Sequence, residues 1–407
     1  MNFLFAWRYF RAKKSTTAIN IIAWISIVAI IIGTASLILV LSVFNGFEDL
    51  VKSLYSSFYP DIRITPASGK QLVLTQAQLD DLRSVKGVRS VSMSVEEKAL
   101  LRNGEYQSII ILKGVDASYG RVTTVPAHMI SGTFNTGSEE QPLLVLGAGI
   151  ENAVGVLSDR NITPLVVYVP RKGEVTLSDP FKSLSADTIQ TSGAFVIQQE
   201  FDNKYALTNL AFVKNMLGMP PDAYGAAEIS VLPGHEPDDI RDEMKKKLGD
   251  GYVVHNRFQQ NAGLYTVMQI EKWVIYAILS LILVVAAFNM IGALTMLVLE
   301  KKQDISILHA MGASRSFIQR IFLSEGLLLA IMGGVIGMLL AFLVGWAQTK
   351  YHLIPLTGST FMIDYFPVKM VLSDFLLVST TVLVIALIAS WMPSAKAARQ
   401  QLVLRSE

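Results

Sequence analysis

Four long runs of uncharged and mostly apolar residues constrain this chain more than any other feature. They lie at residues 15–47, 273–299, 326–349 and 375–395. A bilayer core about 30 Å thick needs roughly 20 apolar helical residues, and a charge inside it costs several kcal/mol. Each run is therefore long enough to cross a membrane once.

Composition supports this interpretation. The chain has 407 residues, of which 51% are hydrophobic and 17% charged, with a mean hydropathy of +0.43. These values are typical of an integral membrane protein rather than a soluble one. The formal net charge of +2 gives no reason to expect a nucleic-acid partner. The absence of cysteine excludes structural disulfides, thiolate catalysis and cysteine-based metal sites.

The distribution of charge predicts an orientation. Basic residues without an acidic neighbour precede the first run, namely Arg8, Arg11, Lys13 and Lys14, and Glu48 and Asp49 follow it. The positive-inside rule then places the N-terminus in the cytoplasm, and four crossings return the C-terminus there. The first run far exceeds the roughly 7 to 15 apolar residues of a signal peptide, so we expect a retained anchor. Residues 1–10 suit either an interfacial amphipathic helix or a plain flank of that anchor.

Residues between the first two runs have globular composition and number roughly 220, enough for one or two compact domains. Short β-branched or alternating segments predict strands at 61–65, 88–95, 108–115, 143–146, 165–169, 194–198 and 228–231. Helix signals occur at 75–85, 209–217 and 238–248. The predicted fold is therefore an α-helical membrane protein with four transmembrane helices and a large α+β extracytoplasmic domain inserted between helices 1 and 2.

These signals divide the chain into nine segments. In chain order, we expect a cytoplasmic amphipathic N-terminus (1–18), the first span (19–44), the external domain (45–268), the second span (269–299) and a cytoplasmic helix (300–314). The third span (315–348), an external loop (349–370), the fourth span (371–393) and a cytoplasmic tail (394–407) follow. Within the external domain, the polar stretch 170–185 suits either a protruding hairpin or an ordinary surface loop.

The polar segment 300–326 separates the second and third runs. Ile305, Leu308 and Met311 are spaced to share one helix face, Asp304 is placed to cap the helix start, and Gly312 suits its left-handed end. Ser314 or Ser316 is expected to cap the next helix, the latter with Gln319 as a capping box. The result would be a short amphipathic helix and a glycine elbow leading into the third span, although an ordinary connecting loop has similar composition.

Several kinds of chemistry lack a sequence signal. No P-loop or G-x-S-x-G motif occurs, and the five histidines show no metal-ligand spacing. The apolar runs carry no acidic or basic residue, which disfavours a carrier built on intramembrane charges. We therefore expect no catalytic, cofactor or metal site in this chain, and any transport would need an external motor.

The order of one span, a large external domain and three further spans resembles the FtsX/MacB-type permease subunits of ABC transporters. The stretch WMPSAKAARQ also resembles their closing pattern, here Pro393, Ala397, Ala398 and Arg399. The resemblance implies that the elbow is a coupling helix seated on a separate ATPase dimer, which would hold the ATP and Mg²⁺. The implied ATPase-coupling residues are Asp304, Ile305, Leu308, His309, Met311 and Gly312.

More specific motifs are similar to the LolC/LolE branch of lipoprotein-releasing permeases. They are the N-G-F-E segment at 45–48, KGVD at 113–116, LGAGIENAVGV at 146–156 and the F-I-D-x-x-P-like stretch at 361–367. The resemblance implies a bacterial inner-membrane protein that releases triacylated lipoproteins to a periplasmic carrier. It also implies a second permease subunit, identical or homologous, and leaves open whether the role is LolC-like, LolE-like or hybrid.

Two further sites follow from this resemblance and from helix spacing. A carrier-binding hook would correspond to the polar stretch, with Pro170, Arg171, Lys172, Gly173 and Pro180. Apolar residues spaced to continue the first and second spans are expected to line a substrate entrance, although ordinary packing explains each of them equally well: Phe44, Phe47, Val51, Leu54, Leu264, Val267 and Met268. A MacB-like exporter of other substrates and an FtsX-like signalling subunit remain as alternative functions.

Overall fold

The computed structural model describes residues 17–160, 164–170, 184–356 and 363–399. It divides into two compact units. Unit 1 comprises Met1–Leu50, Thr266–Thr357 and Ile363–Glu407, and unit 2 comprises Val51–Tyr265 with Gly358–Met362. The predicted N-terminal helix at residues 1–10 and the tail beyond residue 399 lie outside the described residues.

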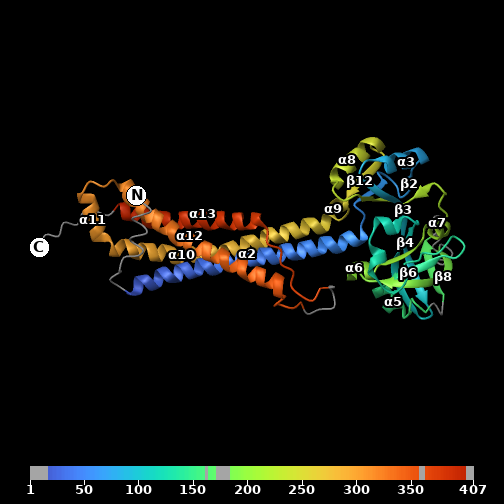
Figure 1. Cartoon of the computed structure of the whole chain (residues 1–407), viewed down its shortest axis with the longest axis horizontal. Helices are drawn as coiled ribbons and strands as arrows, with labels where there is room; N and C mark the ends of the chain where they lie inside the picture. Colours follow the sequence, from blue (N-terminus) through green and yellow to red (C-terminus); the bar gives the residue numbers. More distant parts are fainter. Residues whose placement is uncertain (1–16, 161–163, 171–183, 357–362, 400–407) are drawn as a thin grey trace, which may run out of the picture. The chain divides into compact units, whose positions relative to one another are not determined.

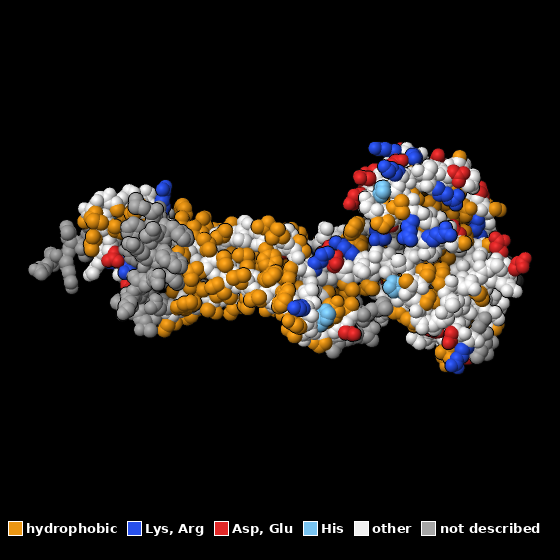
Figure 2. Space-filling model, viewed as in Figure 1, with side chains coloured by type: hydrophobic (Ala, Val, Ile, Leu, Met, Phe, Trp, Pro, Cys, Tyr) orange, Lys and Arg blue, Asp and Glu red, His pale blue; other side chains and the backbone are white. Residues whose placement is uncertain are grey.

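Unit 1 is helical. The described residues contain four helices that are long and apolar enough to cross a membrane, and Figure 1 shows them running alongside one another. They are α2 (Thr17–Phe58), α10 (Ala262–Glu300), α12 (Arg315–Tyr351) and α13 (Leu372–Ala398), and the short helix α11 (Lys302–Ala310) joins α10 to α12. Hydrophobic side chains cover these helices on the face seen in Figure 2. All four apolar runs thus form helices, as predicted.

Small residues on α12 let α2 approach closely. A Cβ on Gly333 would lie 2.8 Å from Ile30, and one on Gly337 would lie 2.7 Å from the backbone oxygen of Ile31. Glycine removes this clash and allows the two backbones to pack against each other, as is common between membrane helices. The core around this contact includes Ile27, Leu37, Ile38 and Leu283. The α2–α12 pair is therefore closely packed over two turns.

Unit 2 is built on one mixed sheet. Ten strands of the described residues form it, with β12, β1, β11, β3, β4, β9, β6, β8 and β5 in spatial order and β7 paired to both β3 and β8. Their bounds are Ile62–Pro66 (β1), Val88–Asn103 (β3), Tyr106–Val115 (β4), Met129–Gly132 (β5), Leu143–Gly147 (β6), Leu165–Pro170 (β7), Leu184–Phe195 (β8), Tyr205–Asn209 (β9), Ala226–Val231 (β11) and Tyr252–Asn256 (β12). A separate ribbon pairs β2 (Leu72–Val73) with β10 (Ala223–Tyr224).

Helices enclose three hydrophobic clusters in unit 2. One contains Ile150 of α5 (Ala148–Val154) and Val213 of α7 (Leu210–Leu217), and another contains Leu82 of α3 (Gln76–Ser84) and Met244 of α8 (Pro237–Leu248). The third is aromatic and includes Phe58 from the end of α2, together with residues from α4 (Tyr119–Val122) and α6 (Gln199–Asp202). Short helices η1 (Val125–His128) and α9 (Arg257–Gln260) complete the unit.

The predicted α+β character is confirmed, and the three predicted helices correspond to α3, α7 and α8. Six of the seven predicted strands correspond to β1, β3, β4, β6, β7 and β11. The expected strand at 194–198 is misplaced, because β8 ends at Phe195 and runs back to Leu184. Its sequence is largely polar, so apolar alternation gave no signal. Strands β5, β9 and β12 were not predicted from the sequence.

Candidate functional site

The expected coupling segment forms the predicted helix and elbow. α11 ends at Ala310, Gly312 has φ of +88°, and α12 begins after Ser314. The Ser314 hydroxyl accepts a hydrogen bond from the Phe317 N–H at 3.3 Å. The capping box expected from Ser316 is wrong, since this residue lies inside α12. Asp304 does not cap α11 either: it lies in the first turn and pairs with Lys301 at 3.3 Å.

The apolar residues of this segment face two directions. Ile305 is 2% exposed and packs into the core of unit 1, and Leu308 is half-buried. Met311, at 72% exposed, and Ile307, at 59% exposed, remain open to solvent. His309 is half-buried, and its Nε2 has no hydrogen-bond partner among the described residues. Spacing alone grouped Ile305 with Leu308 and Met311, and therefore missed Ile307 as part of the exposed apolar surface.

The N-G-F segment of α2 contacts the connection between α12 and α13. A Cβ on Gly46 would overlap the carbonyl oxygen of Pro367, so only glycine fits there without a shift. The rings of Phe47 and Phe366 meet edge to face at 5.8 Å. The Lys369 N–H donates to the carbonyl oxygen of Ser42 at 2.9 Å. Two motifs far apart in the sequence therefore form one joint, which we call the α2 joint.

Asn45 adds a polar contact to the α2 joint. Its Nδ2 donates to Asp374 Oδ2 at 2.5 Å. Asp374 lies in the first turn of α13, and its side chain is only 6% exposed. Glu325 in α12 is also buried, at 2% exposed. The uncharged runs predict spans that bury no acidic or basic residue, and this prediction is wrong because the helices extend beyond those runs and bury Glu325 and Asp374.

The residues expected at the substrate entrance separate into two groups. Val51 and Leu264 pack against the aromatic cluster of unit 2, and Leu54 is buried in that unit. In unit 1, Phe47 contacts Phe366, Phe44 and Met268 are half-buried, and Val267 is exposed. Packing therefore accounts for Val51, Leu54 and Leu264, whereas Val267 presents an uncovered apolar side chain.

The two strands that flank the expected hook pair with each other. β7 and β8 pair antiparallel, with Pro170 opposite Leu184 at the outer end. The expected excursion at 170–185 lies largely outside the described residues. Four of the proposed hook residues, Arg171, Lys172, Gly173 and Pro180, lie outside the described residues.

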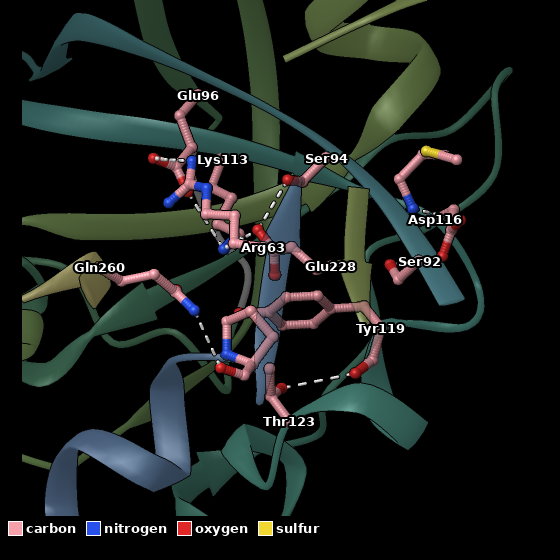
Figure 3. Close-up of polar contacts among 12 residues, drawn as sticks. Arg63, Ser92, Ser94, Glu96, Lys113, Asp116, Tyr119, Thr123, Glu228 and Gln260 are labelled. Carbon is pink, nitrogen blue, oxygen red and sulfur yellow. Dashed lines mark hydrogen bonds and ion pairs between the residues drawn. The ribbon is translucent and has the colours of Figure 1, made fainter. Parts of the chain in front are cut away.

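The KGVD motif explains part of the architecture of unit 2. Lys113 of β4 is 1% exposed, and its Nζ lies 2.7 Å from Glu228 and 3.1 Å from Glu96. Arg63 pairs with Glu96 at 3.2 Å, and the Ser94 hydroxyl donates to Glu228 at 2.7 Å. Figure 3 shows these side chains converging from neighbouring strands. We call this group the Lys113 cluster. Its two cations and two carboxylates balance, which burial of charge requires.

Attraction between the opposite charges of the Lys113 cluster sets the protonation states of its side chains. Burial by itself would raise the pKa of Glu96, but the adjacent charges of Lys113 and Arg63 lower this pKa to about 2. Burial would also lower the pKa of Lys113, but Glu228 and other neighbours raise this pKa above its ordinary value. Burial raises the pKa of Tyr119, whose ring lies under the Lys113 ammonium, to about 12. All these groups therefore keep one protonation state near neutral pH.

The remaining residues of the motifs also have packing roles. Asp116 accepts hydrogen bonds from the Ser92 hydroxyl, the Met93 N–H and the Ser118 N–H at 2.7, 2.8 and 2.8 Å. Gly147 lies against the backbone of Asp202, and Gly155 ends α5 with φ of +63°. The described residues contain no group of His, Cys, Asp and Glu that could hold a metal ion. The motif residues of unit 2 described above thus make packing and hydrogen-bond contacts within the unit.

Two protein-family models match parts of this chain. Residues 276–402 match the FtsX-like permease C-terminal family, and residues 23–164 match the MacB-like periplasmic core domain. The lipoprotein-releasing system transmembrane protein LolE of Haemophilus influenzae is 26% identical over 414 residues, covering 98% of this chain and 97% of that protein. LolC of Neisseria meningitidis serogroup B is 26% identical over 419 residues, covering 97% and 96%.

Among solved structures, the periplasmic region of MacB from Actinobacillus actinomycetemcomitans aligns with a TM-score of 0.36 and 11% identity, covering 53% of this chain and 98% of that chain. The resemblance inferred from the sequence motifs is confirmed by the relatives that match nearly the whole chain. This chain is similar to the LolC and LolE lipoprotein-releasing system transmembrane proteins over nearly its whole length, and parts of it match the FtsX-like permease C-terminal and MacB-like periplasmic core families.

Proposed function

We propose that this chain is the permease subunit of an ABC transporter that extracts lipoproteins from the bacterial inner membrane and hands them to a periplasmic carrier. The observation that carries this proposal is the similarity to LolE and LolC over nearly the whole chain. Unit 2 would then lie in the periplasm, and both termini and α11 would lie in the cytoplasm. This orientation is supported by the basic residues that flank the apolar runs.

The physical problem in this function is the transfer of acyl chains. Each CH₂ group moved from the bilayer into water costs about 0.8 kcal/mol, so three free chains would cost tens of kcal/mol. An apolar space lined by α2 and α10 of two permease subunits would avoid most of this cost. The exposed apolar side chains of α10, including Val267 and Trp273, support its role in such a lining. Two identical subunits or an unlike pair would serve equally well.

The movement driven by ATP hydrolysis would reach the permease through α11. An ABC transporter permease works with an ATPase partner, and the exposed side chains of Ile307 and Met311 offer an apolar surface for its groove. Because Ile305 of the same helix is anchored in the core of unit 1, movement of α11 would be passed to α10 and α12. Asp304, Leu308, His309 and Gly312 complete the proposed coupling segment.

The carrier would bind at the hook, with Pro170, Arg171, Lys172, Gly173 and Pro180 among its residues. The antiparallel β7–β8 pair supports this placement, because it flanks the proposed hook with two strands of the sheet, and exposed loops on a rigid scaffold are common binding sites. Deleting residues 173–179 should abolish carrier capture while preserving assembly with the ATPase. Undiminished capture of the carrier in a pull-down would exclude the hook.

Reconstitution tests the whole function. In proteoliposomes that contain the permease complex and its ATPase, a triacylated lipoprotein should stimulate ATP hydrolysis, and release should require the soluble carrier. A lipoprotein with its acyl chains removed is the matched control. ATP hydrolysis that does not depend on lipoprotein would instead support the MacB-like exporter or the FtsX-like signalling subunit.

Coupling is tested separately by Leu308→Asp and Ile307→Asp. Both should uncouple ATP hydrolysis from release, because a carboxylate would be buried in the proposed apolar contact. Gln303→Asp adds the same charge at an exposed polar position of α11 and should leave release unchanged. Release at the unmodified rate by Ile307→Asp would contradict the coupling assignment.

A further inference from the structure

Lys272 joins α10 to the α2 joint described above. Its Nζ donates to Asn45 Oδ1 at 2.8 Å and lies 3.6 Å from Asp374 Oδ1. The lysine belongs to α10, the asparagine to α2 and the aspartate to α13. One ammonium group thus bridges three helices of unit 1 at the end of the bundle where α2 meets the 366–369 connection.

The partners of Lys272 do not depend on it. Asn45 Nδ2 donates to Asp374 at 2.5 Å and lies 3.5 Å from the carbonyl oxygen of Lys369. Asp374 therefore keeps a hydrogen bond when the ammonium leaves. Lys272 can also leave without becoming an isolated buried charge, because its side chain is 30% exposed, whereas that of Asp374 is 6% exposed.

The other helices are held together by contacts that exclude α10. Glycines of α12 lie against the α2 backbone, Gly46 lies on Pro367, and the Lys369 ammonium pairs with Asp49 at 2.5 Å. Breaking these contacts would separate closely packed backbones. α10 packs into the core of unit 1 further along its length, through Leu283, Met290 and Leu294. Around Lys272, in contrast, it exposes Ile270, Trp273 and Val274, and one turn further along Tyr276 contacts Thr381 of α13 at 2.5 Å.

We propose that Lys272 is a releasable clasp that holds this end of α10 against a stable unit of α2, α12 and α13. This inference rests on the proposed function in one respect: release of the clasp would let α10 move and widen the apolar space that receives acyl chains. Lys272 is a positioning residue in this account, since it acts by setting the place of α10.

Distance measurements between spin labels test the clasp directly. The chain contains no cysteine, so a pair introduced at exposed positions is labelled selectively within it. Val40→Cys with Ile278→Cys reports on α2 and α10, and Val40→Cys with Leu343→Cys reports on α2 and α12. Both pairs are measured in the assembled complex without nucleotide or lipoprotein.

Lys272→Met should increase the population with longer α2–α10 distances by about fivefold, the factor for loss of one partly exposed charged contact. The α2–α12 distribution should remain unchanged. Lys272→Arg keeps a cationic donor and should behave almost as the unmodified chain does. Lys350→Met is a matched control, because Lys350 lies over the ring of Trp346 at 5.0 Å rather than between helices.

An unchanged α2–α10 distribution in Lys272→Met would overturn the clasp, and so would equal broadening of both distributions. The release assay separates this outcome from failure of the proposed function. If the unmodified complex releases no lipoprotein but the α2–α10 distances respond to Lys272→Met, the proposed function is wrong and the clasp stands. If release occurs and the distances do not respond, the clasp alone is wrong.

Discussion

Lys113 in unit 2 and Lys272 in unit 1 both pair with carboxylates, but their surroundings differ. Lys113 is enclosed, with Glu228 at 2.7 Å and Glu96 at 3.1 Å. Lys272 reaches one carboxylate at 3.6 Å and remains partly exposed to solvent. An enclosed cation can leave only if the fold opens, whereas a partly exposed one can exchange its partners for water. We therefore expect Lys113 to keep its partners as long as unit 2 stays folded, and Lys272 to form and break its contact reversibly.

Removing the enclosed ammonium should have the largest effect. Lys113→Met would leave Glu228 without its cation and Glu96 with Arg63 alone. We therefore expect the free energy of unfolding of unit 2 to fall by about 3–5 kcal/mol. Hydrogen exchange of β3 and β4 in the intact chain measures this loss. Lys204→Met is the control, because Lys204 pairs with Glu200 at the surface and should change stability by less than about 1 kcal/mol.

A double substitution sharpens this result. Lys113→Met combined with Glu228→Gln removes one charge of each sign, and Glu96 keeps Arg63 as its partner. The double variant should therefore be more stable than Lys113→Met alone. If the two variants lose equal stability, packing of the lysine stem rather than charge balance holds this part of the sheet.

The next largest effect should come from low pH, which should weaken the Lys113 cluster. The pKa of Glu96 is lowered from 4.5 to about 2 in the folded chain. A carboxylate with a lowered pKa stabilises the fold above its unfolded pKa, and this contribution is lost as the pH falls from about 4.5 towards 2. The change should be about 3 kcal/mol. Exchange protection of β3 should decrease over this range, and Glu96→Gln should flatten the decrease. An equally steep decrease in Glu96→Gln would assign it to other carboxyl groups.

Crowding the α2 joint should have a smaller effect. Gly46→Ala places a methyl group against Pro367, and overpacking of this kind costs about 1–3 kcal/mol. Thermal denaturation of the detergent-solubilised complex should show a lower midpoint. Gly292→Ala in α10 is the matched control, since a Cβ there meets nothing within 4 Å. A similar denaturation midpoint for both variants would mean that the α2 joint accommodates a methyl group without strain. The α2 joint would then not be more closely packed than α10.

Local sequence patterns predicted the elements that have strong periodicity or end signals. The four apolar runs predicted the long helices because helix length and membrane thickness are linked. Pro237, the acidic first turn and the basic last turn predicted α8. Strand β8 was largely missed because its polar residues derive their conformation from pairing with β6 and β7, which lie elsewhere in the sequence.

The sequence by itself determined the membrane character, the α+β insert, the elbow after α10 and the resemblance carried by its motifs. Tertiary structure decided which partners the motif residues contact: Gly46 contacts Pro367, Asn45 contacts Asp374, and Lys113 contacts Glu228. It also separated Ile305, which is buried, from Ile307, which is exposed. The physical reason is that hydropathy and helix period act over neighbouring residues, whereas close packing and charge pairing depend on which distant segments the fold brings into contact.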